Sequence, residues 1–494
     1  MCNNLPFFPT NYFENLYKQM KQLFKLFSIS VLFLYFSTIS HAQEVWDWQK
    51  CIEYALKNNI QLKQSDLNIQ LGESTVQSNR MNYSPNINGS SNYSLRIGNN
   101  FNFFTSTYEQ QKVQYQDYGL NVSQPIFDGL VTPNNVKKSK LDLQALKLDQ
   151  ETLKNNIQLQ ILTAFLNIMN ANEQHQQAIN QRASTQDQYE RTKALIDAGA
   201  AAEKALLDID AQLTSEDLTI SQIKNQLELA YLSLKIILQL DVKQNITVKI
   251  PELPQDLTIA NLEDVQTIYA DALGLRPEVK SSQLKIESAK KQIAAAKGNY
   301  YPTLSFVGNL NTFFTTQNKI SNQLLTGNTT AVGFVEGTLQ RVLIPETITT
   351  QSKNPYKNQL NQNLNYAFGL SLNVPIFNKF QVQTAVKQSK LQYQNAILTE
   401  KQTEIDLFNT IQQAYLKAQT AIENFKAAQK NMATATKSYD YAVERLNAGS
   451  INQLEVNLSK TNLDNALSKF TQAKYEYLFN TKLLDFYQGK KIEL

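Results

Sequence analysis

The stretch GLNVSQPIF at residues 119–127 returns as GLSLNVPIF at residues 369–377, 250 positions further along the chain. A second stretch, NYSPNI at residues 82–87, returns as NYYPTL at residues 299–304, 217 positions further along. Both motifs occur in the same order in each half of the chain. Repetition of this kind predicts two tandem copies of one structural unit.

The two shifts also show where each copy lies in the sequence and where the second copy is longer than the first. Ala198–Gly199 recurs as Ala448–Gly449 with the larger shift of 250, so the change of shift falls between the two motifs of the second copy. An insertion of 33 residues (250 minus 217) is therefore expected in a long loop over about residues 315–363. We place the first repeat at residues 43–260 and the second at residues 261–494.

Alternation of polar and apolar side chains predicts two strands in each repeat. The expected strands cover about residues 87–97, 115–124, 303–314 and 364–374. Each has about ten residues, the length that crosses an outer membrane when the strand is tilted. One face is apolar and is expected to face lipid, and it comprises Tyr118, Leu120, Val122, Tyr366, Phe368, Leu370 and Leu372.

The predicted strands could belong either to a soluble β-sandwich or to a transmembrane barrel. Alternation alone also fits two hairpins that pack into a soluble sandwich. In lipid, however, four strands cannot stand as an open sheet, because the edge groups would stay unpaired. Closure with other chains is then required, and three copies give 12 strands, enough to leave a lumen where 8 would be filled by side chains. The polar inner face favours this homotrimer.

The rest of each repeat is predicted to be helical. Helices are expected at about residues 48–81, 133–196, 203–240, 261–298, 382–447 and 451–488, and apolar residues spaced by three and four give the last helix of each repeat a coiled-coil pattern. A helix over residues 133–196 is roughly 95 Å long at 1.5 Å per residue. Helices of this length form a rod or a tube. The fold class is thus mixed α and β, mainly a coiled-coil α-barrel with a four-stranded contribution to a trimeric 12-stranded transmembrane β-barrel.

The amino-terminal residues read as an export signal. Lys21 and Lys25 precede an apolar run at residues 26–36, and Ser40-His41-Ala42 provides a small-x-small cleavage site. This pattern is typical of a secretory signal peptide cleaved after Ala42. A single anchoring helix is the alternative, but the run is short for one. We therefore assign residues 1–42 to an amino-terminal extension followed by the signal peptide. Our hypothesis is that translation starts at Met20 and that residues 1–19 result from a misassigned start codon.

Composition and motifs exclude several functions. The net charge of +4 is too small to indicate a nucleic-acid partner. After removal of the leader the chain has one cysteine, Cys51, and one histidine, His175. A single cysteine excludes an intrachain disulfide, and the two residues alone do not make a metal-ligand cluster. No Cys-x-x-Cys, His-Glu-x-x-His, Gly-x-Ser-x-Gly or Gly-x-x-x-x-Gly-Lys pattern occurs. We therefore expect no enzyme, no cofactor and no metal site.

The duplicated Pro-Ile-Phe after a strand, the Tyr-x-Pro before each hairpin and the Ala-Gly turn nine residues after a tyrosine together resemble the outer membrane efflux proteins typified by TolC. The resemblance covers essentially the whole mature chain. It implies a trimer with an outer-membrane barrel that continues as a helical tunnel across the periplasm. It also implies docking onto a periplasmic adaptor and an inner-membrane pump that supplies the energy.

The resemblance further points to residues at the periplasmic tip. The best-known members carry carboxylates six positions after the turn glycine in both halves and nine positions after it in the second. Here Glu455 lies six positions after Gly449 and Asp208 lies nine after Gly199, while Ala205 and Leu458 occupy the other slots. Threefold symmetry would make two carboxylate rings that select cations. The alternative is that Asp208 and Glu455 are two ordinary carboxylates in contact with solvent. Gly199 and Gly449 either only cap the helical hairpins or also contact the adaptor.

Three functions stay open at this stage. The first is the exit duct of a tripartite system that exports drugs and other toxic small molecules. The second is the outer-membrane factor of a one-step protein secretion system, which has the same fold. The third belongs to another class, a periplasmic coiled-coil rod that serves as a structural or adaptor protein.

Overall fold

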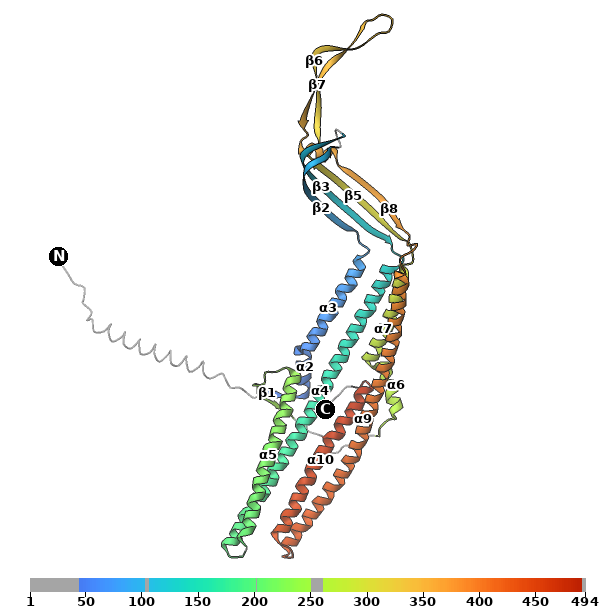
Figure 1. The fold of residues 1–494 in the computed structure, drawn as a ribbon. Helices are drawn as coiled ribbons and strands as arrows, with labels where there is room; N and C mark the ends of the chain where they lie inside the picture. Colours follow the sequence, from blue (N-terminus) through green and yellow to red (C-terminus); the bar gives the residue numbers. More distant parts are fainter. Residues whose placement is uncertain (1–43, 103–105, 201, 250–260, 491–494) are drawn as a thin grey trace, which may run out of the picture.

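The structure is a computed structural model that describes residues 44–102, 106–200, 202–249 and 261–490. The molecule is elongated, with a β-sheet at one end and the turns between the longest helices at the other (Figure 1). The predicted signal peptide, its cleavage after Ala42 and the extension at residues 1–19 lie outside the described residues. None of the described helices is long and apolar enough to cross a membrane.

The helices and strands follow the order of the two repeats. The helices are α2 (Trp48–Asn58), α3 (Ile60–Met81), α4 (Val131–Asp197), α5 (Glu203–Leu238), α6 (Val265–Leu275), α7 (Pro277–Gly298), α8 (Tyr356–Gln362), α9 (Gln381–Asn447) and α10 (Gln453–Tyr487). The strands are β1 (Glu44–Trp46), β2 (Asn86–Asn102), β3 (Thr107–Phe127), β4 (Ile246–Val248), β5 (Thr303–Thr315), β6 (Lys319–Phe334), β7 (Arg341–Lys353) and β8 (Asn365–Asn373).

The main sheet is antiparallel with the strand order β2-β3-β5-β8. In the first hairpin Asn86 pairs with Ser123, and in the second Thr303 pairs with Asn373. Asn86 and Thr303 are related by the shift of 217, and Ser123 and Asn373 by the shift of 250, the same shifts that relate the sequence motifs. The hairpins therefore have the same register, which confirms that the fold is built from two copies of one unit.

Two strands exceed their predicted length. β2 continues to Asn102 and β3 begins at Thr107 and runs through the Pro-Ile-Phe motif to Phe127. β3 can extend this far because it has a partner on each side, although the pairing shifts between Pro125 and Phe127 in a β-bulge. In the second repeat Pro-Ile-Phe follows the end of β8 instead.

The segment at residues 315–363 is not the loop that we expected from the sequence. It contains the antiparallel hairpin β6–β7, which projects beyond the main sheet, and the short helix α8 (Figure 1). Gly327 and Gly337 have φ values of +80° and +89°, so they permit a β-bulge and the turn of the hairpin. Their content of threonine, isoleucine, valine and leucine is the signal for these strands.

Two predicted helices are each divided in two. The helix expected at residues 48–81 breaks at Asn59, whose side chain accepts hydrogen bonds from the N–H groups of Gln61 (2.8 Å) and Leu62 (3.4 Å). The helix expected at residues 261–298 breaks at Arg276, directly before Pro277 at the first position of α7. Asn59 and Arg276 are related by the shift of 217, and both are 5% exposed.

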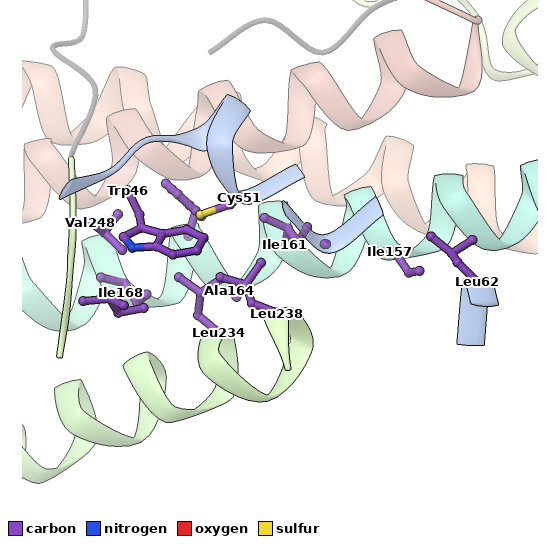
Figure 2. Close-up of a cluster of buried hydrophobic side chains, with 13 residues drawn as sticks. Trp46, Cys51, Leu62, Ile157, Ile161, Ala164, Ile168, Leu234, Leu238 and Val248 are labelled. Atoms are coloured by element: carbon purple, nitrogen blue, oxygen red, sulfur yellow. The ribbon is translucent and has the colours of Figure 1, made fainter. Parts of the chain in front are cut away.

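Each repeat has its own apolar core midway along the helices. In the first, Cys51 and Ala55 of α2 pack with Ile161 of α4, Leu234 of α5 and Trp46 of the small parallel sheet β1–β4 (Figure 2). The second core contains the related residues of α6, α9 and α10, and these are Ile268, Ala272, Ile411 and Leu484. The duplication thus extends to individual buried side chains.

Candidate conduit surfaces

One face of the main sheet is apolar and open to solvent in the single chain. The residues Tyr366, Phe368, Leu370 and Leu372 on β8 are 66–73% exposed. Leu120 is also exposed, and Tyr118 and Val122 are half-buried. Pairing of Leu120 with Leu310 and of Leu310 with Tyr366 places the apolar side chains of three strands on the same face. The predicted lipid-facing residues thus form one continuous surface, and contact with lipid stays a prediction.

Tyr118 lies at the margin of this surface, where α8 covers the outer end of the sheet. Its hydroxyl lies 2.7 Å from the hydroxyl of Tyr356 on α8, whose ring packs against Phe314 of β5 with 4.9 Å between centroids. A tyrosine at such a boundary buries its ring and keeps a partner for its hydroxyl. The sequence did not indicate this cover, because α8 was expected to be loop.

The opposite face of the sheet is lined mostly by small and polar side chains, with Val113, Tyr115 and Phe313 at its outer end. An added Cβ at Gly119 would lie 2.8 Å from the hydroxyl of Ser90 and 3.1 Å from the side-chain oxygen of Asn311. The amide of Asn92 donates a 2.9 Å hydrogen bond to the carboxylate of Asp117 on the neighbouring strand. This face therefore suits contact with water.

Both outer edges of the main sheet are unpaired in the described part of the single chain. β2 pairs only with β3 and β8 pairs only with β5, so each has one row of backbone groups without a strand partner. Ile376 and Phe377, which follow β8, are 95% and 73% exposed. Free edges next to an exposed apolar face are the condition that a sheet resolves by pairing with another chain.

The far ends of the helices carry two related turns. Gly199 and Gly449 have φ values of +71° and +67°, and each donates its N–H to the carbonyl three residues earlier at 2.8–2.9 Å. The N–H of the following residue reaches the carbonyl five residues earlier, as in a Schellman motif. Added Cβ atoms at either glycine would meet nothing within 4 Å. The glycines are thus needed for their backbone angle rather than for space.

Asp208 lies in the second turn of α5 and Glu455 in the first turn of α10, shortly after these glycine turns, and both are exposed. The N–H of Glu455 donates a 3.0 Å hydrogen bond to the side chain of Asn452, the cap of α10. Glu455 also lines a hollow of about 470 Å³ between α9 and α10 that includes Lys437 and Arg445. The structure places both carboxylates at the same end of the molecule, and their joining into rings stays a prediction.

A further pair of turns, where the sheet meets the long helices, did not stand out in the sequence. Two successive residues are left-handed before α4, Gly129 (φ +68°) and Leu130 (φ +67°), and two before α9, Lys379 (φ +53°) and Phe380 (φ +60°). These positions are related by the shift of 250. The only residue in the sequence that indicated a left-handed turn was Gly129. Its counterpart in the second repeat is Lys379, a residue type that does not indicate such a turn.

The sequence profile of the outer membrane efflux protein family matches residues 51–238 and 268–489, one segment in each repeat. The chain belongs to this family. The outer membrane efflux protein BepC of Brucella suis is 19% identical over 429 residues, which cover 85% of this chain and 80% of BepC.

Solved structures of membrane channels have the same fold. The Campylobacter jejuni CmeC outer membrane channel superimposes with a TM-score of 0.69 at 21% identity, over 90% of this chain and 85% of CmeC. CusC gives a TM-score of 0.69 at 16% identity, over 90% of this chain and 92% of CusC.

Membership of the outer membrane efflux protein family settles the class of function. The chain is an efflux channel of the outer membrane that extends into the periplasm, and it is a transport protein rather than an enzyme. Family membership also shows that the alternative of a periplasmic coiled-coil rod is wrong.

Proposed function

We propose that three copies of this chain close their sheets into a 12-stranded barrel through the outer membrane and their helices into a tunnel across the periplasm. The observation that carries this proposal is the open sheet, which has an exposed apolar face and two unpaired edges. Each unpaired backbone group would cost several kcal/mol in lipid. Pairing of β8 in one copy with β2 in the next removes every such edge.

The internal repeat supplies a register for this contact. β3 pairs with β5 inside the chain, and under the shifts of 250 and 217 these strands correspond to β8 and β2. The pair Leu120–Leu310 then corresponds to Leu370 opposite Tyr93 of a neighbouring copy. Tyr118–Thr312 corresponds in the same way to Phe368 opposite Leu95. Apolar residues meet apolar residues in both pairs, which supports the register.

The proposed trimer is the exit duct of a tripartite efflux system for small toxic molecules. The chain offers no catalytic motif of its own, so an inner-membrane pump must supply the energy. The turns at Gly199 and Gly449 are the parts farthest from the sheet and are proposed to meet a periplasmic adaptor. Export of proteins by a one-step secretion system is the competing use of the same duct.

Conductance of the purified protein in a planar lipid bilayer tests the proposal. Discrete current steps of uniform size are expected, because each inserted trimer adds one water-filled pore. As a matched control, Leu370→Pro removes one backbone donor at the proposed edge contact, and it should abolish the steps while helix content is kept. A wild-type protein that leaves the bilayer current unchanged would contradict the proposed pore.

The cargo is tested separately in cells. Deletion of the gene should raise sensitivity to amphipathic drugs and dyes if the duct serves small-molecule efflux. Normal drug resistance together with loss of a secreted protein from the medium would favour the one-step secretion system instead.

A further inference from the structure

The polar face of the sheet has a hollow at the end farthest from the long helices α4 and α9. Its volume is about 520 Å³, within the range of small-molecule sites. It is lined by residues of β2, β3 and β5 and of the turn after β5, namely Arg96, Asn100, Phe101, Val113, Tyr115, Phe313, Thr315 and Gln317. The hollow thus spans three neighbouring strands.

Two aromatic rings form one wall of this hollow. Tyr115 and Phe313, on adjacent strands, are stacked with 5.6 Å between ring centroids and 25° between ring planes. Both side chains are only half-buried, so part of each ring faces the hollow. Exposed rings on the polar face of a sheet offer a surface on which a planar aromatic molecule can pack.

The base of the hollow is buried and cross-linked by a hydrogen bond. Val113 and Thr315 are each 5% exposed, and Gln317 is 8% exposed. The side chain of Gln317 donates a 3.4 Å hydrogen bond to the carbonyl of Phe101, which ties the turn after β5 to the end of β2. A base held in this way keeps its shape when a ligand enters, because few side chains need to become ordered.

Arg96 supplies the charge. Its side chain is exposed at the margin of the hollow, and no carboxylate among the described residues lies within 4.0 Å of its nitrogen atoms. The acidic residues on the same face have partners of their own. Asp117 accepts from Asn92, and Glu109 accepts from Asn102 and Thr107. The guanidinium is therefore free to bind an external anion through two parallel hydrogen bonds.

We propose that this hollow binds planar aromatic anions, that is, aromatic rings that carry a carboxylate or a sulfonate. The ring packs against Tyr115 and Phe313, and the anionic group bonds to Arg96. The inference builds on the proposed function, in which the polar face lines the conduit and the hollow lies at its outer mouth. In the proposed trimer, Arg96 faces Ala367 of a neighbouring copy, a side chain small enough to leave the hollow open.

Calorimetric titration of the purified full-length protein with 2-naphthalenesulfonate tests the site directly. Methanesulfonate provides the charge without the ring, and 2-naphthalenemethanol provides the ring without the charge. We expect the naphthalenesulfonate to bind the wild-type protein more tightly than either partial probe. Arg96→Gln should raise its Kd about tenfold, because a charge-assisted hydrogen bond is lost, and leave the Kd of the neutral alcohol unchanged.

Two further variants separate the ring contact from general effects. Phe313→Leu should weaken binding of both ring-containing probes, because the stacked wall is lost. Arg341→Gln removes an arginine on β7 that is outside the hollow, and its Kd values should equal those of the wild type. Equal Kd for naphthalenesulfonate in the wild type, Arg96→Gln and Phe313→Leu would overturn the site, as would no binding to the wild type.

This titration needs no membrane and no current. Normal bilayer conductance with no binding would overturn the site and leave the proposed channel intact. Binding that depends on Arg96 in a protein without conductance would support the site while contradicting the proposed channel.

Discussion

The backbones of Gly129 and Gly298 touch where the sheet meets the helices. A Cβ added to Gly298 would lie 2.6 Å from the carbonyl oxygen of Gly129, and one added to Gly129 would overlap the carbonyl oxygen of Gly298. Gly298 ends α7 and Gly129 precedes α4, so this contact joins the two repeats. A Cβ on Gly298 would also lie 2.6 Å from Cγ2 of Val131, but the two carbonyl oxygens are backbone atoms, which cannot rotate away.

We therefore predict that Gly298→Ala destabilises the folded protein by about 1–3 kcal/mol through overpacking. The temperature at which helical circular dichroism is lost in detergent measures this change. Gly89→Ala is the matched control, because an added Cβ at Gly89 on β2 meets nothing within 4 Å. Equal melting temperatures for Gly298→Ala and Gly89→Ala would show that the contact is not required.

The glycine turns at the helix tips should tolerate asparagine but not valine. Gly199→Val and Gly449→Val must adopt a left-handed backbone, at a cost of roughly 1–2 kcal/mol each, whereas asparagine accepts this conformation more readily. We expect the valine variants to lose drug export while trimers form normally, and the asparagine variants to keep export. Wild-type drug resistance in cells that express the valine variants at normal levels would argue against the proposed role of the tips.

The two tip carboxylates should control ion selectivity. With Asp208→Asn and Glu455→Gln combined, the ratio of cation to anion permeability in a planar bilayer should fall several-fold towards unity, because the rings lose their charge. Asp210→Asn removes an exposed carboxylate two positions after Asp208, outside the expected ring, and should leave the ratio unchanged. An unaltered ratio in the double variant would remove the ring hypothesis.

Glu173 should make the stability of the helical bundle depend on pH. It lies on α4, and burial raises the pKa of its carboxyl above the ordinary 4.5, although the hydroxyl of Ser468 on α10 partly opposes this. The folded chain then holds the proton more tightly than the unfolded chain. Its contribution to stability is present below the ordinary pKa and is lost as the pH rises through the raised pKa.

The variant Glu173→Gln keeps the shape of the side chain and removes the titration. We predict that it melts at a higher temperature than the wild type at about pH 7.5, and that the difference shrinks at about pH 4. Glu190→Gln, at an exposed position of the same helix, should show no such trend. A Glu173→Gln difference that is independent of pH would contradict the predicted titration.

Much of the fold could be predicted because the chain contains its unit twice. The repeated Pro-Ile-Phe and Tyr-x-Pro motifs fixed two shifts, and these shifts reproduce the registers Asn86–Ser123 and Thr303–Asn373 and the matching cores. The long helices were predicted to within two residues at their ends because no glycine or proline interrupts them. Two copies of one pattern make a chance match improbable.

The parts that were missed depend on residues without a counterpart or on contacts distant in sequence. The break at Asn59 was overlooked because asparagine caps a helix but also occurs inside one. The hairpin β6–β7 lies in the insertion, where no second copy guides the interpretation. The hollow beside Arg96 needs Tyr115 and Phe313 to meet across strands separated by most of a repeat, and no local pattern indicates that.

The pairing of β8 with β2 of a neighbouring copy is tested most directly by an engineered disulfide. The native Cys51 will not interfere, because it is fully buried and burial raises the pKa of its thiol to about 12. A chain with Leu370→Cys and Tyr93→Cys, oxidised in detergent, should run on a denaturing gel as a covalent trimer. The matched pair Leu370→Cys and Asn92→Cys, which places the second thiol on the opposite face, should not. A monomer band from both pairs under oxidation would contradict the trimeric barrel.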